Sequence, residues 1–471
     1  MSVSLFPYAP AMRPLRLLII HPCVGRRVGQ TRYIRTWSMQ PLPAAQVAAI
    51  ARATLGERVE IHFLDDRFER MDETLEADLV CLSIETYTAR RCYQIASAFR
   101  RRRIPVVMGG FHATLCPEEV LRFADAVVAG EAEETFPRLL EDFLGGRLQR
   151  LYRAEGRPAV RVRPDRSIFA GKPYLPVGLL EYSRGCRFHC DFCAITAAFR
   201  ASHRHAPVAQ VLSELDEIWT GKGMIFFVDD NFASDPDAAM ELCQALKGRG
   251  VRWVSQASNT AAWTPGLLDA MRESGCLGVL IGLESLHEEA LLGMHKPFNL
   301  QRGGHLETLA RFREAGLRVY GTFIFGNDSD TPAIFDETVA FAIDQGLFIA
   351  AFNHITPFPG TPLYQRLQQE GRLVYDAWWL DAAYRYNEIP YQPLGMDRAE
   401  LERGCLNARR RFYGWSSIAR RFAEHRILRS GGRMALNYWI INAMHQKDTV
   451  GRSGMPLGDR NDARPLVEVH V

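Results

Sequence analysis

Three cysteines lie close together in the stretch EYSRGCRFHCDFCAI, which covers residues 181–195. Cys186, Cys190 and Cys193 are separated by four and three positions, and Phe192 precedes the last of them. Thiolates this close together on one short segment are suited to binding metal. A disulfide framework would instead need an even number of cysteines at wider spacing. We therefore expect a metal centre with three protein ligands.

The number of ligands distinguishes two kinds of metal centre. A structural zinc ion takes four ligands, and the nearby His189, His203 and His205 provide no well-spaced fourth one. A four-iron cubane has four corners, so three thiolates leave one iron open to a small chelating ligand. The sequence favours the iron–sulfur cluster, with zinc binding or simple core packing of the cysteines as the alternatives.

The composition is that of an ordinary globular protein. Of 471 residues, 47% are hydrophobic and 24% are charged, and the net charge of +3 gives no indication of nucleic-acid binding. Ten cysteines in this length suit reduced thiols in a cytosolic protein. The first residues lack a signal-peptide pattern, and no apolar run reaches the ~20 residues of a spanning helix. We expect a soluble, cytoplasmic protein.

Short apolar runs alternate with amphipathic stretches in the first 150 residues. The pattern predicts strands at 15–20, 59–65, 78–84, 105–110 and 125–131, and helices at 88–103 and 134–144. Such alternation indicates an α/β domain with a doubly wound parallel sheet, whose ligands bind beyond the carboxyl ends of the strands. The candidate cofactor-binding residues at those ends are Ser83, Gly109, Gly110, Gly130 and Glu131.

Two stretches of this region, GGFHATLCPEEV (109–120) and ADAVVAGEAEETF (124–136), resemble the cobalamin-binding domain found in front of many radical SAM enzymes. The resemblance implies that the glycine-rich strand ends lie against the corrin ring. Many such domains carry Asp-x-His-x-x-Gly, whose histidine ligates cobalt. Here LDDRFERMD (64–72) has Arg67 or Phe68 at that position, so a protein histidine is not expected beneath the cobalt. The alternative is a domain that has lost its cofactor and only covers the catalytic one.

A second series of strand–helix units follows the cysteines. Further strands are predicted within 224–234, 252–258, 277–285, 319–331 and 348–364. Together with the strand that precedes the cysteines, they predict a partial TIM-like barrel of six strands. In such barrels the chemistry gathers at the carboxyl ends of the strands, where Asp229, Asp230, Gln256 and Glu284 are predicted. For the two aspartates, capping of a following helix is an equal alternative to catalysis.

Cys-x-x-x-Cys-x-x-aromatic-Cys after a strand resembles the signature of the radical SAM superfamily. In that family S-adenosylmethionine (SAM) chelates the open iron, and reduction of the cluster cleaves SAM to methionine and a 5′-deoxyadenosyl radical. The resemblance implies that Cys186, Cys190 and Cys193 hold a 4Fe-4S cluster, with Phe192 beside it. It also implies that Glu284 contacts SAM, and that a protein such as flavodoxin or ferredoxin supplies electrons.

The last third is less informative. The aromatic stretch 378–393 is suited to lining an apolar pocket or to packing on the barrel. Residues 398–433 contain ten Arg and three Glu, which suits a solvated or substrate-facing helix or, as the alternative, a basic amphipathic helix on a membrane. The predicted domains are a cobalamin-binding domain, a linker, a radical SAM core, a helical substrate-side region and a disordered tail, at 1–150, 151–171, 172–375, 376–446 and 447–471.

The implied domain order is that of a cobalamin-dependent radical SAM enzyme. The leading hypothesis is a methyltransferase acting on an unactivated carbon of an apolar or anionic small molecule: one SAM methylates cobalamin, and a second provides the radical. The second hypothesis is an oxidative cyclase or ring-rearranging enzyme with the same cofactors. The third is an iron–sulfur sensor or structural protein. A tRNA-modifying methylthiotransferase is disfavoured because the N-terminal cysteines do not cluster in the sequence.

Overall fold

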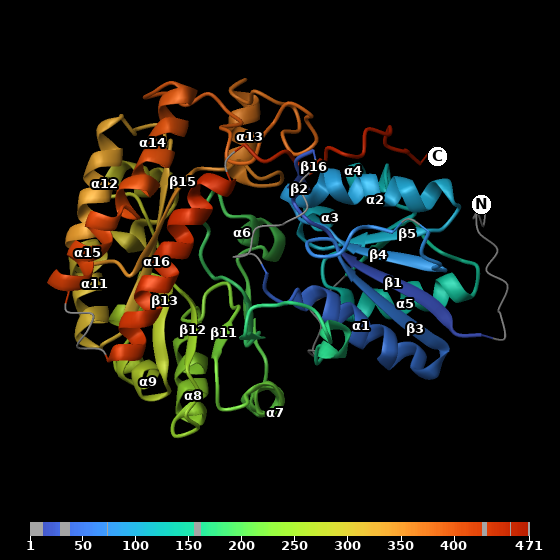
Figure 1. The fold of residues 1–471 in the computed structure, drawn as a ribbon, viewed down its shortest axis with the longest axis horizontal. Coiled ribbons are helices and arrows are strands. Elements are labelled where there is room, and N and C mark those ends of the chain that lie inside the picture. Colours follow the sequence, from blue (N-terminus) through green and yellow to red (C-terminus); the bar gives the residue numbers. More distant parts are fainter. Residues whose placement is uncertain are drawn as a thin grey trace. The chain divides into compact units, whose positions relative to one another are not determined.

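The computed structural model describes residues 13–28, 38–72, 74–154, 162–425, 431–452 and 454–469. The described residues form two compact units (Figure 1). The first unit lies within Met1–Leu175, Ala377–Tyr386 and Gly454–Val471, and the second within Pro176–Asp376 and Asn387–Ser453.

A six-stranded parallel sheet forms the centre of the first unit, in the order β3-β1-β4-β5-β6-β7. Its central strands are almost wholly apolar because helices cover both faces. The strands are β1 (Leu15–His21), β3 (Val59–Asp65), β4 (Leu79–Ser83), β5 (Val106–Gly109), β6 (Ala126–Ala129) and β7 (Leu151–Arg153). The order places β1 in the interior of the sheet, between β3 and β4.

Helices lie on both faces of this sheet (Figure 1). Helix α1 (Leu42–Leu55) and helix α5 (Ala132–Leu144) pack against each other and against the face that carries Leu15, Leu17 and Ile19 of β1. On the other face lie α2 (Ala89–Arg101), α3 (Phe111–Leu115) and α4 (Pro117–Leu121). Short 3-10 turns are η2 (Gly56–Arg58), η3 (Thr86–Thr88) and η4 (Arg166–Phe169).

Two segments from late in the chain complete the first unit. Strand β16 (Gly458–Asp459) pairs with β2 (Gly25–Arg26), and the Asp459 amide donates to Gln94 of α2 at 2.8 Å. In the segment 377–386, the Trp379 indole N–H donates to both oxygens of Glu119, at 3.1 and 3.0 Å. These contacts assign both segments to the unit that begins the chain.

The second unit is built on another six-stranded parallel sheet, in the order β8-β11-β12-β13-β14-β15. The strands follow one another in chain order, each separated from the next by helical segments, as in a barrel that stays open between its first and last strands. They are β8 (Val177–Leu180), β11 (Met224–Phe227), β12 (Trp253–Ala257), β13 (Cys276–Glu284), β14 (Arg318–Phe325) and β15 (Ile349–His354). The predicted fold class is confirmed.

Helices and a small hairpin surround this sheet. The hairpin joins β9 (Ser183–Gly185) to β10 (His203–His205). The helices are α6 (Ala194–Phe199), α7 (Val208–Ile218), α8 (Pro236–Leu246), α9 (Leu267–Glu273), α10 (Glu288–Gly293), α11 (Gly304–Glu314), α12 (Ala333–Asp344), α13 (Pro362–Gln369), α14 (Arg398–Phe412), α15 (Trp415–Glu424) and α16 (Gly432–Arg452). The 3-10 turns are η5 (Asn259–Trp263), η6 (Pro297–Asn299) and η7 (Gln301–Gly303).

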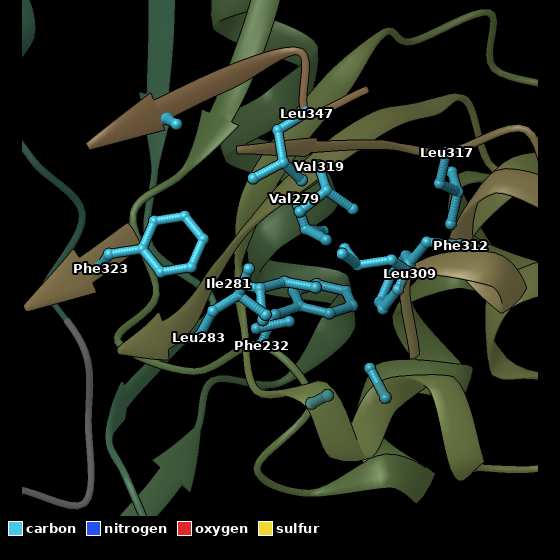
Figure 2. Packing of buried hydrophobic residues seen from close by; sticks show 14 of the residues in the cluster. Phe232, Val279, Ile281, Leu283, Leu309, Phe312, Leu317, Val319, Phe323 and Leu347 are labelled. Atoms are coloured by element: carbon cyan, nitrogen blue, oxygen red, sulfur yellow. The ribbon is translucent and has the colours of Figure 1, made fainter. Parts of the chain in front are cut away.

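The core of the second unit lies between its sheet and the outer helices (Figure 2). Alternate strand residues such as Val279, Ile281 and Val319 lie in one hydrophobic cluster with Leu309 and Phe312 of α11. The residues between them on the strands face the other side of the sheet and are only partly buried. That second face is therefore the one open to a ligand.

The two units divide the chain at places that differ from the predicted domains. Strand β7 lies in the predicted linker, and the first unit continues to Leu175. The predicted disordered tail includes the end of α16 and β16. Composition misses β16 because its polar groups are satisfied by partners far away in sequence, such as Gln94 for Asp459. In the part of the chain that the structure describes, no helix is long and apolar enough to cross a membrane.

Replacing Phe312 with Ala should lower the free energy of unfolding by about 3–5 kcal/mol, because the ring is fully buried in the helix-facing core. Leu306 lies on the same helix but is 57% exposed, so Leu306→Ala should change the free energy by less than about 0.5 kcal/mol. Urea unfolding of both variants measures the difference. Equal effects would contradict the assignment of the core.

Candidate functional site

The three cysteines lie on the segment that joins β9 to α6. Cys186 directly follows β9, and Cys193 directly precedes α6. Gly185, the last residue of β9, has a φ of +81°, and a Cβ there would come within 2.0 Å of the Ser202 carbonyl oxygen. Only glycine therefore lets the hairpin close directly before the first thiol.

Hydrogen-bond donors face two of the three sulfurs. The Asn231 amide donates to Sγ of Cys186 at 3.4 Å. Burial raises the pKa of the Cys193 thiol, and the backbone N–H groups of Thr196 and Ile195 lower it. The Thr196 hydroxyl donates to the Phe188 carbonyl at 3.2 Å. Donors of this kind stabilise sulfur in its thiolate form and tune iron–sulfur clusters. The loop therefore fits the cluster that its sequence implies.

The described residues include no group of three His, Cys, Asp or Glu side chains placed to hold a single metal ion. A cubane binds each thiolate at a different iron, so this finding does not count against a cluster. Burial raises the pKa of the Cys190 thiol to about 12, and the Lys296 ammonium lowers it. Cys190 thus lies within electrostatic reach of a buried cation.

Neighbouring segments hold the cysteine loop at both sides. Phe188 stacks on Phe298 of η6, with ring centroids 3.9 Å apart. The Asp191 carbonyl accepts from the backbone amide of Leu363 in α13 at 3.1 Å. Phe192, the aromatic residue of the motif, is partly buried and packs against the core of the second unit. Its predicted contact with a cofactor stays a prediction.

Asp229 and Asp230 follow β11 and hold the strand that leads into the cysteines. Asp229 accepts from the Tyr182 backbone amide at 2.8 Å and from the Ser183 hydroxyl at 2.7 Å, and Asp230 accepts from the Gly185 amide at 2.7 Å. Neither caps the next helix, since that cap comes from Asp235. The geometry favours positioning of the cysteine loop, and the catalytic role predicted for both aspartates stays a prediction.

Glu284 closes β13 and forms a buried ion pair with Lys296, with Oε1 and Nζ 2.6 Å apart. Burial lowers the pKa of the Lys296 ammonium, but the Glu284 carboxylate outweighs that effect and the net pKa is raised. Gly282 makes room for the pair, because a Cβ there would come 2.1 Å from Glu284 Oε1 and 2.8 Å from Lys296 Nζ. Glu284 itself has a φ of +66°. The sequence indicated Glu284 but gave no signal for Lys296.

Further polar groups lie toward the carboxyl ends of β12 and β13. Gln256 is on the partly buried face of β12, opposite to the buried Ser255. Asn299 donates to the Gly282 and Leu283 carbonyls, and Asn259 donates to the Phe298 carbonyl. The Oδ1 atoms of Asn259 and Asn299 are buried without a hydrogen-bond partner. Such unpaired acceptors suit a polar ligand at this edge of the sheet.

The predicted cobalamin-binding residues lie at the carboxyl edge of the sheet in the first unit. Ser83 and Gly109 are paired across β4 and β5, and Gly110 follows directly. Gly110 has a φ of +110°, and a Cβ there would lie 2.9 Å from the Ile84 carbonyl oxygen. Gly130 and Glu131 follow β6 at the same edge. The structure brings the five residues to one edge, and their contact with cobalamin stays a prediction.

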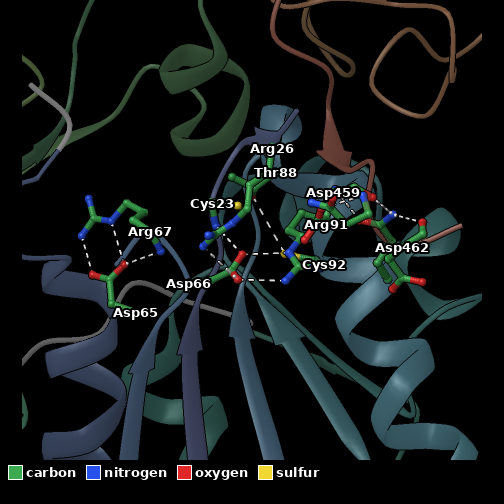
Figure 3. Close-up of polar contacts among 12 residues, drawn as sticks. Cys23, Arg26, Asp65, Asp66, Arg67, Thr88, Arg91, Cys92, Asp459 and Asp462 are labelled. Atoms are coloured by element: carbon green, nitrogen blue, oxygen red, sulfur yellow. Dashed lines mark hydrogen bonds and ion pairs between the residues drawn. The ribbon is translucent and has the colours of Figure 1, made fainter. Parts of the chain in front are cut away.

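Two buried aspartates organise the segment after β3 (Figure 3). Asp65 binds the Arg67 guanidinium at 2.9 and 2.7 Å, and Asp66 binds Arg91 through two contacts of 2.8 Å. Burial raises the pKa of each carboxyl, but the arginines outweigh it and the net pKa is lowered. Arg67, which occupies one of the two positions aligned with the cobalt-ligating histidine of other domains, is thus held by an ion pair.

His21 lies at the end of β1, close to these ion pairs, and was not identified from the sequence. Burial and the Arg67 cation lower the pKa of its imidazole to about 4. The imidazole is therefore neutral at pH 7. The sequence around it, IIHPC, does not match the Asp-x-His-x-x-Gly motif of a cobalt ligand. His21 can therefore be identified only from its position in the fold.

Asp229→Asn should change how stability depends on pH. Burial raises the pKa of Asp229 to about 7, above the ~3.9 of an unfolded aspartate. Its contribution is therefore fully present below pH ~4 and lost as pH rises through ~7, by up to about 4 kcal/mol. Urea unfolding between pH 4.5 and 7.5 should show wild type losing stability relative to Asp229→Asn. A pH-independent difference between wild type and Asp229→Asn would contradict the assignment.

Replacing Cys186, Cys190 and Cys193 together with Ala should abolish iron binding. Anaerobically reconstituted wild type should hold about four iron atoms and labile sulfide, whereas the triple variant should hold almost none and should not cleave SAM. Cys116→Ala, a change in the other unit, should keep its iron. Iron and sulfide analysis with visible absorption measures this, and a triple variant that still cleaves SAM reductively would refute the cluster assignment.

Two known families match ranges of the chain that include the two candidate sites. Residues 180–342 match the radical SAM superfamily, and residues 37–140 match the B12 binding domain. The first range contains the three cysteines, both aspartates and the Glu284–Lys296 pair, and the second contains Arg67 and the glycine-rich strand ends. The cofactors of these families are a 4Fe-4S cluster with SAM and cobalamin.

Individual relatives match across both units. The chain is 26% identical over 424 residues to a bacteriochlorophyllide d C-12(1)-methyltransferase of Chlorobaculum tepidum, covering 87% of this chain and 88% of the relative. It is 28% identical to the hopanoid C-2 methylase of Rhodopseudomonas palustris, covering 77% and 71%. The fold is similar to that of TsrM from Kitasatospora setae, a radical SAM methyltransferase solved with cobalamin and a 4Fe-4S cluster, with a TM-score of 0.60 at 17% identity over 85% and 82% of the chains. The chain therefore belongs to the radical SAM enzymes that carry a B12-binding domain ahead of the radical SAM domain.

Proposed function

We propose that this enzyme transfers the methyl group of SAM to an unactivated carbon of a small molecule. The observation that carries this proposal is the extent of the similarity to relatives named as methyltransferases. It covers 87% of the chain in one case and 77% in another, and so includes the B12-binding domain as well as the radical SAM domain. A protein that kept only the cluster for sensing would have no use for a second cofactor domain.

The residues of the second unit are assigned to holding the radical precursor. When bound, the cluster supplies the electron that cleaves SAM, and cobalamin supplies a carrier for the methyl group. Cys186, Cys190 and Cys193 bind the cluster, and Asp229 and Asp230 fix the strand before it. Reductive cleavage consumes an electron, which a reducing protein such as a flavodoxin or ferredoxin would provide.

Glu284 and Lys296 are assigned to orienting SAM. Their charges are already paired within the protein, so the site adds no unpaired buried charge when it is empty of ligand. The unpaired Oδ1 atoms of Asn259 and Asn299 supply acceptors at the same edge. This arrangement suits a zwitterionic ligand, because it offers both charges and neutral acceptors in one place.

The substrate is assigned to the class of apolar or anionic small molecules. The face of the sheet turned away from the outer helices carries the partly buried side chains of Phe226, Val254 and Leu280. Apolar residues that are only partly covered favour a ligand with apolar surface. The relatives named above, a bacteriochlorophyllide methyltransferase and a hopanoid methylase, carry names of large apolar substrates.

SAM labelled with deuterium in its methyl group tests the proposal. Anaerobic enzyme with cobalamin and a low-potential reductant should yield S-adenosylhomocysteine and 5′-deoxyadenosine, with deuterated methyl groups on the bound cobalamin. Mass spectrometry measures all three. If only 5′-deoxyadenosine forms, the cyclase or rearrangement hypothesis replaces methyl transfer. If neither product forms while the cluster is intact, the protein is a sensor or structural protein.

A further inference from the structure

Helices α15 and α16 present an apolar surface to solvent in the second unit. Trp415 of α15 is 56% exposed, and Leu436 and Ile440 of α16 are 60% and 48% exposed. Single exposed apolar residues are common on protein surfaces, but a contiguous group marks an interaction site. We call these three residues, together with Trp439, the α15–α16 surface.

Aromatic contacts make the α15–α16 surface continuous across the two helices. Trp415 stacks on Trp439 with ring centroids 6.3 Å apart and an interplanar angle of 25°. Phe422 of α15 also contacts Trp439, at 5.4 Å. On α16, Leu436 and Ile440 are four residues apart and therefore lie on one side of the helix. The exposed residues thus form one surface and not scattered points.

Hydrogen bonds and packing on the inner sides of α15 and α16 set the rotation of both helices, so the same residues always face outward. The Tyr438 hydroxyl donates to the Ile418 carbonyl at 2.9 Å, and both residues pack with Phe348. The wholly buried Arg421 donates to the Phe412 carbonyl and to Asn442 of α16. Rotating either helix to bury its apolar surface would break these bonds and leave buried polar groups unpaired.

Cations lie at both ends of the apolar stripe on α16. Arg433 precedes Leu436 by three residues, Lys447 follows Ile440 by seven, and both are exposed. Between positions 432 and 447 the sequence contains no Asp or Glu, and the first acidic residue after this range is Asp448. On α15, Glu424 is paired with Arg420. The charge next to the apolar stripe is therefore positive.

We propose that the α15–α16 surface docks on an anionic lipid membrane. Trp415, Leu436 and Ile440 enter the boundary between headgroups and acyl chains, and Arg433 and Lys447 bind lipid phosphates at the two ends of the helix. Tryptophan favours this interfacial zone, and a helix with an apolar stripe between cations lies in the plane of the interface. A symmetric contact with a second copy would bring the cations of two helices together, which disfavours that occupant. The inference rests on this surface alone and not on the proposed activity.

Vesicle flotation of the full-length protein tests the proposal. The protein should float with vesicles of phosphatidylcholine containing phosphatidylglycerol, less with phosphatidylcholine alone, and less again at high salt because the charges are screened. Leu436→Glu with Ile440→Glu should lower the bound fraction at least tenfold. Arg433→Glu with Lys447→Glu should remove the preference for the anionic lipid. All four side chains are exposed, so the variants should fold normally, which circular dichroism checks.

Leu394→Glu is the matched control, because Leu394 is 64% exposed but lies outside α15 and α16. It should bind vesicles as wild type does. Three results would overturn the proposal: no binding of wild type to anionic vesicles, equal loss in the control, or a dimer in light scattering that the Leu436→Glu and Ile440→Glu changes dissociate. The assay needs no turnover, so its failure is distinguishable from failure of the methyl-transfer proposal.

Discussion

The position of the cysteine loop depends on the two carboxylates that follow β11. Asp229 and Asp230 accept hydrogen bonds from Tyr182, Ser183 and Gly185 in the strand before the loop. Cys186 comes directly after these residues, so the sheet sets the place of the first thiol. Asn231, the next residue along the same turn, donates to that thiol. One short turn therefore fixes both the backbone and the sulfur, and the remaining contacts of the loop build on this anchor.

Both units use the same physical device at the carboxyl edges of their sheets. Charges there are buried but paired: Glu284 with Lys296 in the second unit, and Asp65 with Arg67 in the first. Removing one member of such a pair would leave an uncompensated charge in a low-dielectric site. Side chains held in this way are oriented before a ligand arrives, which is what a site for a reactive intermediate requires.

Sequence reasoning located the strands and the cysteine loop because both leave local signals. Apolar runs mark buried strands whatever lies elsewhere in the chain, and the predicted strand 59–65 coincides with β3. Glu284 could be identified from the end of β13. Lys296 could not, since it lies twelve residues further on, in a context without a motif, and becomes informative only when the backbone turn brings it to 2.6 Å from Glu284. Strand β7 was missed because three residues provide too little periodicity.

The largest difference concerns residues that contact partners hundreds of positions away. The Trp379 indole donates to Glu119, and the Asp459 backbone amide donates to Gln94. Composition placed the first in a substrate region and the second in a disordered tail, because a single sequence contains no information about which distant partner satisfies a polar group. The roles of the candidate site residues are equally hard to predict from the sequence, because the orientation of a side chain toward a cofactor depends on tertiary contacts.

The pairing of β2 with β16 places a constraint on biosynthesis. Strand β2 is made well before its partner, because Gly458 follows Arg26 by 432 residues. At roughly 5–20 residues per second, the intervening ~430 residues take about 20–90 s to synthesise. Once β7 has been made, the first unit has its central sheet but still lacks β16, so the side of α2 that binds Asp459 stays uncovered on the nascent chain. The first unit is thus finished only after the whole of the second unit has been made.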